Sequence, residues 1–161
     1  MQRALHLTTY AILALVTLFG APVLAEGAMV RYEVQSDFES AKDNVKLAIT
    51  NQGLVITAES HINEMLERTG DDLGLGGPVY TDAVAFEFCS ARFSRLMMAA
   101  DPHNIVFCPF VISVYQVPAN PDTVYVAYLR PENAEGSEEA QQALAEVAEF
   151  LDGIAREATE W

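Results

Sequence analysis

The sequence predicts an α+β domain with a mostly antiparallel sheet of about five strands and helices packed on one face. Three observations lead to this fold. A clear hairpin pattern covers residues 109–129, strand-like runs alternate with helical apolar periodicity before it, and a long amphipathic segment follows it. The chain has 161 residues, of which 51% are hydrophobic, and this is enough for a single core.

The first half of the domain reads as strand, helix and strand. A short strand is expected over residues 30–34, and Ser36 with Glu39 three positions later forms a capping-box signal for a helix. Gly53 is placed to end that helix, and residues 54–58 are apolar and β-branched enough for the next strand. One helix face carries the apolar side chains Phe38, Ala41, Val45, Ala48 and Ile49.

A second, shorter helix and a loop come next. Ser60 is a candidate cap for this helix, which ends by Gly70. Its inward-facing residues are expected to be Ile62, Met65 and Leu66. Residues 70–78 contain four glycines and the acid pair Asp71 and Asp72, but the spacing matches no calcium or phosphate loop, so we expect a flexible connection.

Another strand and helix lead to the hairpin. Residues 79–88 alternate loosely as a strand, and residues 90–100 form a helix that Asp101-Pro102 ends. The inward residues of this helix are Phe93, Leu96, Met97 and Ala100.

The hairpin gives the strongest strand signal in the chain. Residues 109–117 and 123–129 both alternate, and residues 118–122 supply the turn. An acidic helix over about residues 137–158 should then lie across the sheet. Its apolar stripe comprises Ala140, Ala143, Leu144, Val147, Phe150, Leu151, Ile154 and Ala158.

The N-terminal segment indicates export. Arg3 precedes an apolar run that ends in small residues, which is typical of a secretory signal peptide over residues 1–25 with cleavage after Ala25. The alternative is an uncleaved membrane anchor, because no charge occurs between Arg3 and Glu26. We expect cleavage, and therefore a single domain over residues 26–161 that is secreted or periplasmic and has no membrane contact.

The charge of the protein excludes some partners. The net charge is −14, and removal of the signal peptide deletes one arginine but none of the 23 acidic residues. Such a surface repels nucleic acid and anionic lipid. From residue 131 to the C-terminus, nine acidic residues face a single base, Arg156, which we interpret as a solvated helix face.

The segment that begins at Cys89 resembles a known family. Twelve residues after Cys89 come Asp101-Pro102, followed by Pro109 and then Tyr115. These offsets are similar to those of domain-of-unknown-function family 302, and the resemblance runs from about residue 38 to 131. It implies a compact α+β domain with the capacity to form homodimers, and it implies no activity.

The chain departs from the family pattern at one position. Phe110 stands where the family often has its second cysteine, whereas the second cysteine here is Cys108. Because side chains on a strand repeat every two residues, Cys108 and Phe110 point to the same face of the sheet. If Cys89 ends the neighbouring strand, the two thiols can still meet.

Three interpretations of the cysteines remain open. The first is a Cys89 to Cys108 disulfide, which suits an even cysteine count in an exported chain and would stabilise by about 3 kcal/mol on the chain-entropy model. The second is a reactive Cys89 thiol at a helix N-terminus, near Arg92, Arg95 and His103, suited to a small anion or an oxidant. The third is a pair of inert, buried thiols.

A metal site is not expected. Cys89, Cys108, His103 and His61 are the only nearby candidates, and no close pair of zinc ligands occurs among them. We expect no cofactor, and we interpret the tyrosines of the hairpin, Tyr115, Tyr125 and Tyr128, as packing residues.

The sequence therefore favours an exported binding or interaction module that is not an enzyme and binds something small or another subunit. The alternative is a thiol-dependent redox or small-anion-binding protein centred on Cys89.

Overall fold

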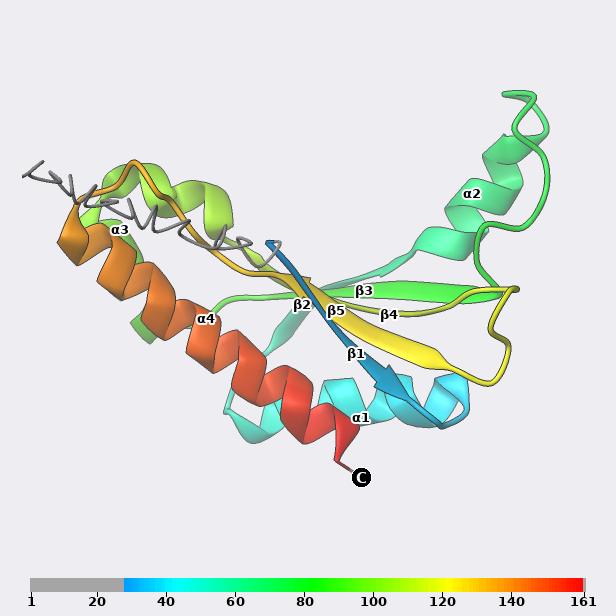
Figure 1. Ribbon diagram of the computed structural model, residues 1–161, viewed down its shortest axis with the longest axis horizontal. Helices are drawn as coiled ribbons and strands as arrows, with labels where there is room; N and C mark the ends of the chain where they lie inside the picture. Colours follow the sequence, from blue (N-terminus) through cyan, green and yellow to red (C-terminus); the bar gives the residue numbers. More distant parts are fainter. Residues whose placement is uncertain (1–27, 161) are drawn as a thin grey trace, which may run out of the picture.

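The computed structural model describes residues 28–160, which form a five-stranded antiparallel sheet with the order β1-β5-β4-β3-β2 (Figure 1). All four pairs of neighbouring strands are antiparallel. The strands are β1 (Met29–Val34), β2 (Ile56–His61), β3 (Asp82–Phe88), β4 (Phe110–Gln116) and β5 (Val124–Leu129). The predicted α+β fold class is confirmed.

Four α-helices and a 3₁₀ helix connect the strands or follow them. They are α1 (Phe38–Asn51), α2 (Ile62–Gly70), α3 (Ala91–Ala100), η1 (Pro102–Phe107) and α4 (Glu138–Thr159). Helices α1 and α4 pack against each other and cover one face of the sheet, while α3 packs against α4 (Figure 1). Helix α2 rises at one end of the sheet on the side away from α1 and α4 (Figure 1).

The core lies between the sheet and the helices α1 and α4. On α4, the buried side chains follow the predicted apolar stripe from Ala140 to Ala158, and on α1 they are Ala41, Val45, Ala48 and Ile49 as expected. Alternate strand residues complete the core, namely Val84, Phe86, Phe88, Phe110, Ile112, Val114, Val124 and Val126. Since strand side chains alternate, the intervening residues point to the opposite face of the sheet, which these two helices leave uncovered.

The start of α1 differs from the prediction. Asp37, and not Ser36, is the N-cap, because its carboxylate accepts a 2.9 Å hydrogen bond from the backbone N–H of Ser40. A carboxylate at this position satisfies a free N–H and also complements the positive end of the helix dipole. The predicted end of the helix is confirmed, since Gly53 adopts a φ of 72° just beyond it.

The prediction for α2 is wrong in two respects. Ser60 belongs to β2 and His61 occupies the N-cap position without a side-chain hydrogen bond. Throughout α2, which lies wholly within the described residues, no side chain is buried, and Met65 is 41% exposed. The apolar periodicity predicts a core face, but α2 contributes no residue to the core.

Two strand boundaries also differ from the prediction. Strand β3 begins at Asp82, and β2 runs to His61 with an irregular register between Ile56 and Ala58. The hairpin of β4 and β5 lies where it was predicted. The predicted signal peptide over residues 1–25 lies outside the described residues, and within residues 28–160 no helix is long and apolar enough to span a membrane.

Candidate functional site

The two cysteines lie side by side. Cys89 directly follows β3 and Cys108 lies two residues before β4, and the last residue of β3, Phe88, pairs in register with Phe110. This pairing brings Cys89 Sγ to 3.2 Å from Cys108 Sγ, although the two are 19 residues apart in sequence. The sulfurs are not bonded in this structure, and both residues are free thiols.

The environment of the thiols is neutral or acidic. Ser94 Oγ lies 3.6 Å from Cys108 Sγ. The pKa of Cys89 is raised to about 11, chiefly by partial desolvation and in smaller part by the neighbouring Cys108 and Glu87. The thiol form of Cys89 is therefore favoured at neutral pH, in contrast to the thiolate that a position beside a helix N-terminus suggests.

The structure does not gather the other candidate residues around the sulfurs. Within residues 28–160, the hydrogen bonds of the two sulfurs are to each other and to Ser94, and Arg92, Arg95 and His103 are not among the groups that shift the pKa of Cys89. The guanidinium of Arg92 instead lies 4.8 Å from the ring centroid of Phe93. The backbone N–H of His103 donates to Asp101 at the start of η1, and the residue is exposed.

The uncovered face of the sheet carries a row of small side chains. Across the strands, Ala85 of β3 pairs with Ser113 of β4, and Ser113 pairs with Ala127 of β5. Arg31 of β1 continues this row beside Ala127, and its guanidinium lies 5.1 Å from the ring centroid of Tyr125. Because Ala85, Ser113 and Ala127 have side chains no larger than serine, the surface of the sheet forms a depression along this row.

Larger side chains line both sides of this row. On one side lie Met29, Val106, Val111 and Leu129, which are 59%, 78%, 39% and 72% exposed. On the other side, Tyr115 stacks on Tyr125 at 5.1 Å and meets Tyr80 edge to face at 5.6 Å. We call this groove the trough, defined by the floor residues Ser113 and Ala127 and the wall residues Met29, Tyr80, Val106, Val111, Tyr115 and Leu129. Its lining is completed by Pro109, Phe110, Tyr128, Pro131 and Leu151.

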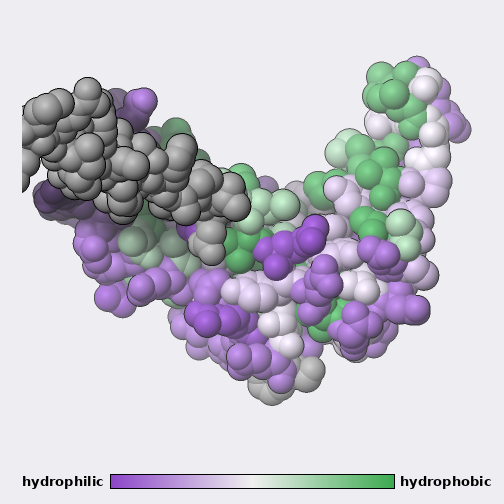
Figure 2. All heavy atoms as spheres, viewed as in Figure 1, coloured by the Kyte–Doolittle hydropathy of each residue, from purple (hydrophilic) through white to green (hydrophobic). Residues whose placement is uncertain are grey.

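The trough has a volume of about 520 Å³. In Figure 2, hydrophobic residues are visible in the hollow and along the raised end formed by α2, with hydrophilic residues at the middle of the hollow, whereas the outer surface of the helical side is mostly hydrophilic. Small-molecule sites are typically concave, mostly apolar and of about 300–1,000 Å³, with a few polar groups. The hydroxyls of Ser113, Tyr80 and Tyr115 are polar groups of this kind.

A hydrogen-bonded cluster fixes α4 to the sheet. The hydroxyls of Tyr32 on β1 and Tyr128 on β5 both donate to Oδ1 of Asp152, at 2.5 and 2.9 Å. Arg156 pairs with the second carboxylate oxygen at 2.5 Å. Burial is the largest cause of a raised Tyr128 pKa, and the bond to Asp152 adds to it, so this hydroxyl stays protonated and acts as a donor. Tyr128 thus has a structural role, and it also belongs to the lining of the trough, as Tyr115 does.

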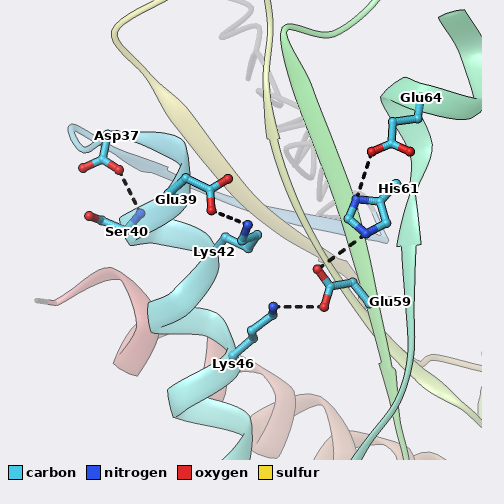
Figure 3. A network of polar contacts seen from close by, with 8 residues as sticks. All are labelled: Asp37, Glu39, Ser40, Lys42, Lys46, Glu59, His61 and Glu64. Atoms are coloured by element: carbon cyan, nitrogen blue, oxygen red, sulfur yellow. Dashed lines mark hydrogen bonds and ion pairs between the residues drawn. The ribbon is translucent and has the colours of Figure 1, made fainter.

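A second polar network joins α1, β2 and α2 (Figure 3). Lys46 on α1 pairs with Glu59 on β2 at 2.9 Å, and His61 lies 3.8 Å from Glu59 and 3.7 Å from Glu64. His61 is therefore engaged with carboxylates at the base of α2. Among residues 28–160, no group of three or more His, Cys, Asp or Glu side chains is arranged to hold a metal ion.

Sequence reasoning found the thiol pair but missed the trough. The signal that could have revealed it is the set of small residues at alternate positions of neighbouring strands, Ala83 and Ala85, Ser113, and Ala127. Such residues leave the backbone accessible where a ligand approaches, but only the register shows that they lie in one row.

Comparisons with known proteins bear on the fold. A family model described as "Domain of unknown function DUF302" matches residues 30–158. A solved structure titled "Crystal structure of uncharacterized conserved protein DUF302 from Bacillus stearothermophilus" is similar, with a TM-score of 0.65 and 15% sequence identity over 81% of this chain and 98% of that chain. At this identity the likeness shows the fold alone. No curated protein matches the chain.

Proposed function

Since this chain belongs to the DUF302 family of domains of unknown function, we propose a function from its own surface: it is an exported, non-catalytic binding module that holds a small apolar molecule in the trough. The observation that carries this proposal is the row of small residues on the uncovered sheet face, between exposed apolar walls. The apolar N-terminal segment with a signal-peptide pattern supports the exported location.

The charge of the protein restricts the ligand further. The residues that line the trough carry no charge, although Arg31 continues the floor row beside Ala127, and the protein has a net charge of −14. An anionic ligand would meet repulsion at long range, while a neutral or cationic molecule would not. The ligand class is therefore a neutral or cationic molecule with an apolar body.

Exposed apolar area also makes self-association the main competing explanation. The wall residues Val106 and Leu129 are more than two thirds exposed, and such patches mark interaction sites of several kinds. A second copy would bring another strongly acidic surface against the first, which opposes close association. We therefore favour a small molecule as the occupant of the trough. The experiment must also be able to detect a homodimer.

Titration with Nile red, a neutral apolar dye, tests the proposal. We expect saturable binding of one dye per chain, with about tenfold weaker affinity in Ser113→Leu, a loss of about 1.4 kcal/mol, because the added side chain fills the trough. The matched control is Ala99→Leu, which adds a similar volume at an exposed position of α3 away from the trough. Circular dichroism confirms that both variants are folded.

Three results would overturn the proposal. One is unchanged dye affinity in Ser113→Leu, which would locate the dye elsewhere. Another is a dimer in sedimentation experiments that Ser113→Leu dissociates, because the trough would then be the interface between two copies. The third is the absence of any saturable binding by the monomer.

The thiol-dependent alternative has weaker support. The 3.2 Å approach of the two sulfurs favours redox chemistry at this position. However, burial and the neighbours of Cys89 raise its pKa to about 11, and a catalytic thiol needs a large thiolate fraction at neutral pH. The alternative of a small-anion site centred on Cys89 needs nearby cations, and Arg92, Arg95 and His103 are not gathered around the sulfurs.

A further inference from the structure

The cysteine pair lies at one end of the trough. Cys108 directly follows η1, the segment that carries the wall residue Val106, and it precedes Pro109 and β4. On the other side of the contact, Cys89 is held at the end of β3 by the pairing of Phe88 with Phe110. A covalent link between the sulfurs would therefore tie the end of η1 to the sheet.

We propose that Cys89 and Cys108 form a disulfide that holds η1 against the end of β3 and so fixes the Val106 wall of the trough. The sulfurs are 3.2 Å apart, and a bond requires about 2.05 Å, so they need to approach by about 1 Å. The part of the proposal that concerns the trough rests on the proposed function, whereas the bond itself does not.

The surroundings of Cys89 and Cys108 favour slow thiol–disulfide exchange. Cys89 is the exposed member and Cys108 is half-buried, so an external oxidant meets Cys89 first. The groups near Cys89 keep it mostly in the thiol form, as its raised pKa shows. Exchange at neutral pH is consequently slow, which fits a bond that is set by the compartment and then persists rather than a bond that turns over.

The oxidant is a disulfide, either a low-molecular-weight disulfide or a thiol oxidase of the exported compartment. The Cys89 thiolate attacks one donor sulfur, the donor disulfide breaks, and a mixed disulfide forms. The Cys108 thiolate then attacks Cys89 Sγ and displaces the second donor thiol. Overall, the protein loses two electrons and two protons, and the donor gains both as two thiols.

Oxidised glutathione is the probe for the bond. After incubation of the full chain, we expect both thiols to disappear from maleimide labelling and the intact mass to fall by two hydrogen atoms, with no added glutathione. Cys108→Ser is the matched control, because it leaves Cys89 without a partner and should retain a bound glutathione. Persistence of two free thiols, or glutathione retained on the wild type, would overturn the bond.

Nile red titration of the reduced and oxidised protein tests the link to the trough. We expect the dye affinity of the wild type to differ at least about threefold between the two forms, and that of the double variant Cys89→Ser/Cys108→Ser, which has no thiol to oxidise, to be unaffected by oxidant. If the bond forms and the wild-type affinity does not change, control of the trough is wrong. If neither form binds dye, the proposed function fails, while the labelling result still decides whether the bond exists.

Discussion

The hydroxyl of Tyr32 on the edge strand β1 donates a 2.5 Å hydrogen bond to Asp152 on α4, across 120 positions of sequence. Together with the bond from Tyr128, it links both strands at this edge of the sheet to the C-terminal helix. The acidic α4 is thus attached to the core by a specific polar contact as well as by its apolar stripe.

Asp152→Asn should destabilise the fold by about 1–2 kcal/mol, because the amide accepts weaker hydrogen bonds than the carboxylate and loses the ion pair with Arg156. Urea unfolding followed by circular dichroism measures the change. Glu149→Gln, on an exposed position of the same helix, removes the same charge without this contact and should have little effect. Equal effects of the two variants would mean that only the overall charge matters.

The contribution of Asp152 should depend on pH. Partial burial raises the pKa of this carboxyl, but the bonds from Tyr32 and Tyr128 and the charges of Arg156 and Arg130 outweigh it, so the pKa lies below the ordinary 3.8. A lowered folded-state pKa stabilises the fold above the unfolded-state value, and this stabilisation is lost as the pH falls through the folded-state value.

The difference in unfolding free energy between wild type and Asp152→Asn should therefore shrink from about pH 5 to pH 2. Urea unfolding at several pH values measures it. A difference that stays constant over this range would show that the carboxylate charge contributes nothing.

Cys89 should alkylate slowly at neutral pH. With its pKa raised from 9.0 to about 11, chiefly by burial, the thiolate fraction at pH 7 is about 100-fold lower than for an unperturbed thiol. Iodoacetamide labelling of the reduced Cys108→Ser variant should be faster than labelling of Cys89 in the wild type, because one cause of the raised pKa is removed. Labelling of wild-type Cys89 as fast as free glutathione would contradict the raised pKa.

Mutations can test which of two adjacent residues, Ser36 or Asp37, caps the N-terminus of α1. Asp37→Ala should lower the thermal midpoint because the free N–H of Ser40 loses its acceptor, whereas Ser36→Ala should leave the midpoint unchanged. Differential scanning calorimetry of both variants makes the comparison. If Ser36→Ala has the larger effect, the capping box predicted from the sequence operates in solution.

The sequence predicted those parts of the fold in which periodicity and burial agree. The stripe of α4 and the hairpin of β4 and β5 have both a regular pattern and a buried face, and both were located within one or two residues. In α2 the periodicity is present without the burial, because the helix touches only the end of the sheet at β3 and none of the described helices covers it. A pattern of apolar residues cannot distinguish these two cases.

The candidate site shows the same limit. The meeting of Cys89 and Cys108 could be anticipated, since it depends only on strand alternation and on neighbouring strands. The trough could not, because it depends on the register that aligns Ala85, Ser113 and Ala127 across three strands. A slip of one residue would have replaced this row with bulky core side chains.

The row of small residues also determines what can vary without loss of the trough. With almost no side chain on the floor, its curvature follows the twist of the backbone, and not the rotamers of particular residues. Relatives that keep the strand register can therefore retain the shape of the groove at very low sequence identity. Differences in the wall positions, such as Val106 and Leu129, would then change the width and polarity of the groove.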